Sequence, residues 1–191
     1  MNVTLVNHKR MEHPKLNLTV RRVEASTFYT LGFHKHHYMA EKINPACKCF
    51  LFEWDNNPVA FIGVINSPGN NRQYSMAFSR IVILPEYQGL GLLKRLVRFV
   101  SGIIKSTSTE EKPVDVYIRT IHPKVGAYLN KDTDNWESTS SDMKKTSKDN
   151  ELGKYNNRKG RVSYSKRYIG ESIYGYEDLL LPVKEMRKRK S

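Results

Sequence analysis

The stretch SRIVILPEYQGLGLLKRL, residues 79–96, decides the fold. An apolar run typical of a buried strand stops at Pro85, a turn with two glycines follows, and a helix begins at once. Because Gly89 and Gly91 carry no Cβ, the turn can present backbone N–H groups. The first helical turn adds unpaired N–H groups and the positive end of the helix dipole. The stretch therefore predicts a cradle for a phosphate or pyrophosphate.

The helix in this stretch is predicted to be amphipathic. Its apolar side chains fall on one face and its basic side chains on the opposite face, which suits a helix that covers a sheet. The apolar residues at helical spacing are Leu93, Leu96, Val97, Val100, Ile103 and Ile104. The turn is neither a Walker A loop nor a GxGxxG fingerprint, so the glycines alone leave a plain connecting turn as the alternative.

The flanking segments predict an α/β (α+β) domain with a mixed sheet. Two apolar runs, 47–54 and 58–65, are separated by turn-forming residues and predict an antiparallel hairpin. The order of alternating elements gives the fold class. The predicted strands are 16–23, 75–84, 114–121 and 161–170 besides the hairpin, and the predicted short helices are 24–32, 38–43 and 123–130.

The segment 131–160 differs in composition from the rest of the chain. Ser, Thr, Asp, Asn and Lys dominate it, and few of its residues are candidates for a core. We expect a long mobile loop with at most one strand near Met143. The chain is therefore predicted to be a single domain over 1–183 with a flexible insertion at about 131–160, followed by a basic tail over 184–191.

The formal net charge of +13 is the strongest compositional feature, with 32 Lys and Arg against 19 Asp and Glu. Such a charge attracts nucleic acid, an acidic protein or a phosphate-rich cofactor, or it serves only as a solubilising surface. The sequence has no nucleic-acid-binding motif of the common kinds to separate these alternatives.

The longest apolar run, residues 59–65, is too short to span a membrane, and the first fifteen residues lack the apolar segment of a secretion signal. Cys47 and Cys49 are one residue apart, where a disulfide is strained, so we expect two thiols in a reducing cytoplasm. The sequence thus predicts a cytoplasmic protein with no membrane partner.

The segment VxLPEYQGLG, ending at Gly91, resembles motif A of the GNAT superfamily of N-acetyltransferases. Gln88 stands at the first position of the family's Gln/Arg-x-x-Gly-x-Gly/Ala turn and Gly91 at the middle glycine, whereas Leu93 replaces a small residue. The resemblance extends over residues 16–130 and implies a mixed, mostly antiparallel sheet flanked by helices. It also implies acetyl-CoA or another acyl-CoA as donor. The residues implied to hold it are Ile83, Leu84, Gln88, Gly89, Leu90, Gly91, Leu92 and Leu93.

The segment GFHKHHYMA, residues 32–40, falls on the acceptor side of the site that this resemblance implies. Many relatives carry a Glu in the strand before motif A, but here the strand SMAFSRIVIL holds only Ser79 and Arg80 as polar members. We therefore expect the general base at His36 or His37, whose side chains titrate near neutral pH. The remaining residues implied for the site are Ser79 and the thiolate-protonating Tyr128 as catalytic groups, with Tyr38 and Arg80 in the acceptor pocket.

Two other interpretations of the histidines stay open. In an extended segment His34 and His36 would point to one side and His37 to the other, and a bent loop with Cys47 and Cys49 could bind zinc. Neither spacing is a recognised zinc pattern, so no metal site is predicted. A polar loop without chemistry is the second alternative.

The leading functional prediction is an N-acyltransferase that transfers an acetyl group from acetyl-CoA to an amine. The alternative is a GNAT-fold protein that modifies or binds nucleic acid, similar to the phage-associated Mom-like branch. Leu93 and the basic late segment, where Tyr164, Tyr168 and Tyr174 offer stacking faces, favour this alternative. An inactive scaffold is the third interpretation. The expected partners are an acyl-CoA and an acceptor that the sequence does not identify, for which nucleic acid and acidic protein are the candidates.

Overall fold

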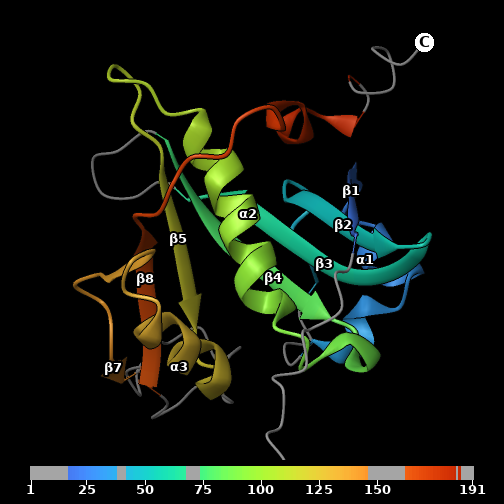
Figure 1. Cartoon of the computed structure of the whole chain (residues 1–191), viewed down its shortest axis with the longest axis horizontal. Coiled ribbons are helices and arrows are strands. Elements are labelled where there is room, and N and C mark those ends of the chain that lie inside the picture. The colour runs from blue at the N-terminus through green and yellow to red at the C-terminus, as the bar shows by residue number, and fades with distance from the viewer. Residues whose placement is uncertain (1–16, 38–41, 68–73, 146–161, 184, 186–191) are drawn as a thin grey trace, which may run out of the picture.

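The computed structural model describes residues 17–37, 42–67, 74–145, 162–183 and 185. An eight-stranded sheet in the order β1-β2-β3-β4-β5-β8-β6, with β7 also paired to β8, forms its centre (Figure 1). The strands are β1 Thr19–Val23, β2 Lys48–Trp54, β3 Asn57–Asn66, β4 Ser75–Ile83, β5 Asp115–Thr120, β6 Trp136–Ser138, β7 Lys144–Lys145 and β8 Val162–Tyr168. The helices are α1 Thr27–Thr30, α2 Leu92–Ser106 and α3 Pro123–Lys131, with 3-10 turns at η1 Phe33–His36, η2 Pro85–Tyr87 and η4 Glu177–Leu180.

The predicted mixed, mostly antiparallel sheet is confirmed. Within the described residues, β4 and β5 form a parallel pair and the other strand pairs are antiparallel. The elements expected from the sequence occur in the expected order. The short helix expected over 38–43 lies mostly outside the described residues.

Helix α2 lies across one face of the sheet (Figure 1). Its apolar stripe is buried, with Val97, Val100, Ile103 and Ile104 fully inaccessible, because these side chains recur on the face turned toward β2, β3 and β5. Successive residues of a strand point to opposite faces, so β2 contributes Phe50 to this core and Leu51 to a second one.

The second core holds the other face of the sheet against α1 and η1. Phe28 and Phe33 provide its aromatic contacts with Phe61. Cys47 and Cys49 are buried in it as free thiols, which confirms the prediction of unpaired cysteines. Burial raises the pKa of the Cys49 thiol to about 12. This core fixes the position of the histidine segment that follows Phe33.

The parallel strands β4 and β5 pair over only part of their length. Three register pairs, from Ser75↔Asp115 to Ala77↔Tyr117, join them. Beyond this point β4 continues to Ile83 and β5 to Thr120, but the two strands no longer pair with each other and diverge (Figure 1). A wedge therefore opens between the carboxyl ends of two neighbouring strands.

A β-bulge lies at the start of this wedge. Gly63 pairs with Arg80 and Val64 with Phe78, so Ser79 is an extra residue in β4. A bulge bends its strand and re-aims the local side chains. The bulge therefore turns the second half of β4 away from β5.

The segment 131–145 corrects the prediction of a mobile loop with few core residues. It contains β6 and β7 rather than at most one strand, and Trp136 is buried beneath Tyr168. Several of its polar side chains, among them Ser138, Thr139 and Asp142, bond to β8. Residues 146–161 of the predicted insertion lie outside the described part of the chain.

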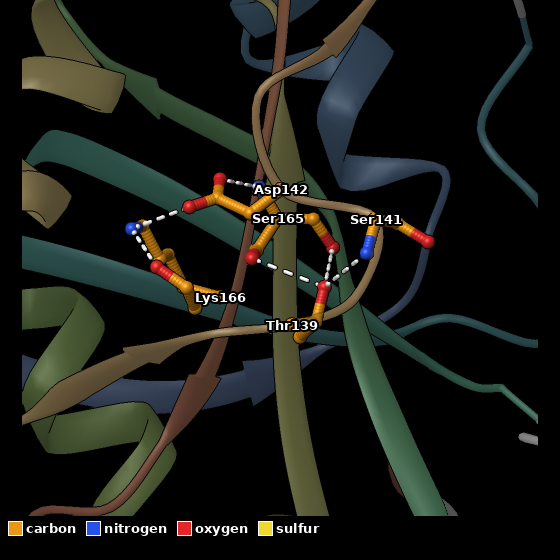
Figure 2. Close-up of polar contacts among 6 residues, drawn as sticks. Thr139, Ser141, Asp142, Ser165 and Lys166 are labelled. Carbon is orange, nitrogen blue, oxygen red and sulfur yellow. Dashed lines mark hydrogen bonds and ion pairs between the residues drawn. The ribbon is translucent and has the colours of Figure 1, made fainter.

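Figure 2 shows the contacts that hold this segment on β8. Lys166, only 5% exposed, donates to Ser138 Oγ at 2.8 Å and to Asp142 Oδ2 at 2.7 Å. Asp142 Oδ1 accepts the Ser165 N–H at 2.8 Å, and the Thr139 hydroxyl donates to Ser165 Oγ at 2.8 Å. Burial alone would raise the pKa of Asp142, but the bonds from Lys166, the Ser165 N–H and Ser138 together outweigh it and lower that pKa. Satisfied buried polar groups of this kind give a loop a fixed conformation.

The chain after β8 crosses the outer side of α2 (Figure 1). The Ile173 N–H donates to the Gly102 carbonyl at 3.0 Å, and Lys105 Nζ donates to the Gly170 carbonyl at 2.6 Å. A Cβ on Gly102 would lie 2.6 Å from Ile173 Cγ1 and 3.1 Å from the Glu171 carbonyl oxygen. Gly102 is therefore required for the close approach of this segment to α2.

We expect Gly102→Ala to lower the free energy of unfolding by about 1–3 kcal/mol, because the added methyl group overpacks the contact. Ser101→Ala is the matched control, since the Ser101 hydroxyl is buried without a hydrogen-bond partner in the described structure. Removing this hydroxyl should leave the free energy of unfolding unchanged or raise it by up to about 1 kcal/mol. Urea denaturation of both variants checks this, and equal losses would contradict the packing described here.

Candidate functional site

A cavity of about 560 Å³ occupies the wedge between β4 and β5. Its walls come from the end of η1, the second half of β4, the turn before α2, the end of β5 and the start of α3. Of the residues expected in the site, it brings together His36, His37, Ser79, Arg80, Ile83, Gln88, Gly89, Gly91, Leu92 and Leu93. Leu84, Leu90 and Tyr128 do not line it, and Tyr38 lies outside the described residues.

The turn between η2 and α2 has the geometry of an anion cradle. Gly89 and Gly91 have φ values of 86° and 72°, the left-handed region that favours glycine. Gln88 Nε2 donates to the Ile83 carbonyl at 2.9 Å, which ties the start of the turn to β4. Gly91 caps α2 without a side-chain hydrogen bond, and the first turn of α2 holds no acidic residue. The first N–H groups of α2 can therefore receive an anion, and the site fits a pyrophosphate.

Leu93 stands where the resemblance leads one to expect a small residue. The side chain is half-buried, packs against the core around α2 and also lines the cavity. The Leu93 side chain is therefore shared between the core and the cavity wall.

His34 and His36 lie on a 3-10 turn and not on an extended segment, so the alternation expected for an extended segment does not apply to them. Phe33 is fully buried, whereas His36 at the end of the turn is exposed and lines the cavity. His37 follows in an extended conformation with its ring 6.2 Å from that of Phe28. His34 does not line the cavity and lies beside Tyr29, with ring centroids 5.5 Å apart.

Among the described residues, no cluster of three or more His, Cys, Asp or Glu side chains could hold a metal ion. No helix within the same ranges is long and apolar enough to cross a bilayer.

Arg80 forms part of the cavity wall next to the bulge at Ser79. It is 6% exposed, and its guanidinium donates to the Ser79 carbonyl at 2.8 Å and to the Lys42 carbonyl at 3.4 Å. These bonds tie the bulge to the chain that follows the histidine turn. Arg80 therefore brings a fixed positive charge to this wall.

The opposite wall contains residues that sequence reasoning did not select. His122 precedes Pro123 at the start of α3, and Arg119, Thr120 and Lys124 lie beside it. The His122 N–H donates to Thr120 Oγ1 at 3.0 Å, and the His122 carbonyl accepts the Gly126 N–H at 2.9 Å. A His-Pro pair between a predicted strand and a predicted helix was the available signal in the sequence.

The ionisable side chains lining the cavity are basic or aromatic. Arg80, Arg119 and Lys124 carry fixed positive charge there, and the cavity has no carboxylate among its described lining residues. Arg119 and Lys124 are exposed and make no ion pair within the described structure. The field in the cavity therefore favours anions over cations.

Tyr128 is committed to contacts away from the cavity. Its hydroxyl donates to Asp132 Oδ2 at 2.8 Å and accepts the Trp136 Nε1–H at 3.2 Å. The Asp132 carboxylate also accepts hydrogen bonds from Arg98 Nε at 2.9 Å and from Asn135 Nδ2 at 3.0 Å. Burial raises the pKa of the Tyr128 phenol, and the bond to Asp132 raises it further. This network joins α2, α3 and β6.

Comparison with known proteins gives the relatives of this architecture. The model of the acetyltransferase (GNAT) family matches residues 17–111, while no curated protein matches the sequence. Among solved structures, an IAA acetyltransferase from Bacillus cereus superposes with a TM-score of 0.56 at 13% identity, covering 79% of this chain and 98% of that one. A ribosomal-protein-S18-alanine N-acetyltransferase from Escherichia coli superposes with a TM-score of 0.55 at 12% identity. The match covers 83% of this chain and 98% of that one.

A spermidine/spermine N-acetyltransferase from Vibrio cholerae gives a TM-score of 0.52 at 16% identity, covering 79% of this chain and 91% of that chain. At such identities the three structures establish a common fold and not a common acceptor.

Proposed function

We propose that this chain, a member of the acetyltransferase (GNAT) superfamily, transfers an acyl group from a CoA thioester to an amine in the cavity described above. Acetyl-CoA is the first candidate for the acyl donor. The observation that carries the proposal is the meeting, in one cavity, of the 88–93 turn, the bulge at Ser79 and the two histidines. The acyl donor supplies a thioester carbonyl, and the chain supplies binding, orientation and proton transfer.

Each wall has a separate task in this proposal. The N–H groups of the turn and of the first turn of α2 hold the pyrophosphate, and the divergence of β4 from β5 leaves room for the donor to reach the centre of the sheet. The Ser79 N–H, outside the β3–β4 register, is the candidate donor to the carbonyl oxygen of the acyl group. A ring nitrogen of His36 or His37 takes the proton of the attacking amine.

The binding step is tested by thermal unfolding with acetyl-CoA, CoA and short oligonucleotides. A ligand at 100 times its dissociation constant adds about 2.7 kcal/mol of stability, so acetyl-CoA should raise the melting temperature clearly. Gly91→Val should abolish this increase, because a β-branched residue is strained at a φ of 72° and its side chain enters the cradle.

Gly175→Val is the matched control. Gly175 has a φ of 85° but does not line the cavity, so its replacement carries a similar backbone strain. This variant should be less stable than the wild type yet keep the increase caused by acetyl-CoA. Stabilisation of the wild type by oligonucleotides and not by acetyl-CoA would contradict the proposal.

A second candidate function is the modification or binding of nucleic acid, as in the Mom-like alternative. The observation that favours it is the cavity lined by Arg80, Arg119 and Lys124 and by no described carboxylate. Such a site suits an anionic acceptor, whether nucleic acid or acidic protein, and repels a polyamine. Retained oligonucleotide binding in the presence of saturating CoA would support an acceptor of this class, and its loss in Arg119→Gln and Lys124→Gln would locate it. The free thiols Cys47 and Cys49 support a cytoplasmic location.

A further inference from the structure

We propose that His122 is the acid that protonates the departing thiolate of CoA. The inference rests on the proposed acetyltransferase function and adds a catalytic group that the sequence did not indicate. It depends on three features: the contacts of Tyr128, the position of His122 in the cavity and the arrangement of histidines on two walls.

The tyrosine expected for this task is occupied elsewhere. The Tyr128 hydroxyl donates its proton to Asp132, and the accepted Trp136 N–H occupies a second site on the same oxygen. Tyr128 does not line the cavity. A proton on this oxygen could reach the cavity only if the contacts joining α3 to α2 and β6 were broken.

His122 lies on the cavity wall where α3 begins, one turn or more before Tyr128. Its backbone is held from both sides, by the bond to Thr120 Oγ1 and by the Gly126 N–H, and Pro123 restricts the chain immediately after it. These bonds fix the His122 Cα at the edge of the cavity, and the exposed side chain lines the wall there. Among the side chains that α3 and its cap place on this wall, it is the imidazole, the side-chain type used most often in general acid–base catalysis.

The histidines divide between two walls. His36 and His37 come from the turn after α1, whereas His122 follows β5 across the wedge. Acyl transfer needs one proton removed at the amine and one delivered at the sulfur, at two different places. A base on one wall and an acid on the other meet this requirement.

The step balances with these groups alone. The amine nitrogen forms a bond to the acyl carbon, and its proton passes to a ring nitrogen of His36 or His37. The carbon–sulfur bond then breaks with its electron pair going to sulfur, and the His122 imidazolium gives its proton to that sulfur. Exchange with water restores both histidines. The other ionisable groups lining the cavity are Arg80 from β4, Tyr87 from η2, Arg119 from β5 and Lys124 from α3.

The test compares two donors that differ only in the leaving atom. The acceptor probe is hydroxylamine, which is unprotonated at neutral pH and needs no base. With acetyl-CoA, His122→Gln should lower kcat about 10²-fold, the range expected for general acid catalysis. With the selenoester analogue the loss should shrink to a few fold, because a selenol is a stronger acid than a thiol and leaves without a proton. His34 is the matched histidine outside the cavity, and His34→Gln should have the same kcat as the wild type with both donors.

A second measurement does not depend on turnover. Ultraviolet absorbance reports the thiolate of bound CoA, and an imidazolium beside the sulfur stabilises this anion. His122→Gln should therefore raise the pKa of the bound thiol, with the CoA dissociation constant at neutral pH changed less than about threefold and the melting temperature unchanged.

Three outcomes would overturn the proposal. An equal loss with both donors would assign His122 a structural role, and an unchanged kcat would assign it none. A loss in Tyr128→Phe that the selenoester restores would return the role to Tyr128. Failure of the wild type to bind acetyl-CoA would instead contradict the proposed function itself, and with it this role.

Discussion

Replacing His36 and His37 together by glutamine is expected to lower kcat by about 10²- to 10⁴-fold for a protonated amine, the range that general base catalysis contributes. The probe amine is 2-aminoethyl phosphate, whose phosphate suits a cavity lined by Arg80, Arg119 and Lys124. An alkylammonium ion has no lone pair, so its proton must be removed before the nitrogen attacks. No carboxylate is present among the described lining residues, and of the three histidines there we assign this task to His36 and His37, which lie across the wedge from His122.

Hydroxylamine provides the internal comparison. It needs no base, so the double variant should acetylate hydroxylamine at close to the wild-type rate while losing activity with the phosphorylated amine. His34→Gln is the matched control, because His34 lies on the same 3-10 turn beside Tyr29 and not on the cavity wall. Equal losses with both acceptors would indicate damage to the turn, and no loss would place the base elsewhere.

Replacing Asp132 by alanine is expected to lower the free energy of unfolding by about 3 kcal/mol. Its carboxylate is the shared acceptor for Arg98, Tyr128 and Asn135, and its side chain is 4% exposed. Removal leaves a guanidinium and a phenol without their acceptor, and losing one partner of a buried pair costs about 3–5 kcal/mol. The lower end applies because the Arg98 side chain is 30% exposed and regains some hydration.

This contribution also depends on pH. Burial would raise the pKa of Asp132, but the bonds from Arg98, Tyr128 and Asn135 outweigh it and hold the pKa below its usual range. A carboxylate with a lowered folded-state pKa contributes stability above its unfolded pKa of about 4 and loses it as the pH falls through the folded-state value. Urea denaturation between pH 7 and pH 2 should therefore show a smaller acid loss in Asp132→Asn than in the wild type.

Asp134→Ala is the control for this network, since Asp134 is an exposed carboxylate two residues away with no bond in the described structure. It should change the free energy of unfolding by less than about 0.5 kcal/mol. A similar loss in both variants would show that Asp132 acts through net charge and not through its hydrogen bonds.

The part of the fold that could be predicted from the sequence depends on local signals. The strand that ends at Pro85, the glycine turn and the apolar stripe of α2 each follow from residue types at fixed spacing, and the structure has all three. The hairpin β2–β3 follows from signals of the same kind, whereas the pairing of β4 with β5 does not. Most residues expected in the site meet in one cavity because they belong to these local units.

What the sequence did not indicate depends on contacts between distant segments. Lys166 is buried because Ser138 and Asp142 accept its protons, and no periodicity marks such a group. Trp136 enters the core through Tyr128 and Tyr168, although its neighbours are polar. His122 reaches the cavity because β5 diverges from β4, and the extent of that divergence is set by three register pairs and a bulge. The bond from the Tyr128 hydroxyl to Asp132 is likewise a contact that no local pattern marks.

A crystal structure of the protein with CoA would test the proposed site. We expect the pyrophosphate to contact the N–H groups of residues 89–93 and the sulfur to lie in the wedge, with His36 or His37 on one side and His122 on the other. A pyrophosphate bound away from this turn, or a sulfur outside the wedge between β4 and β5, would contradict it.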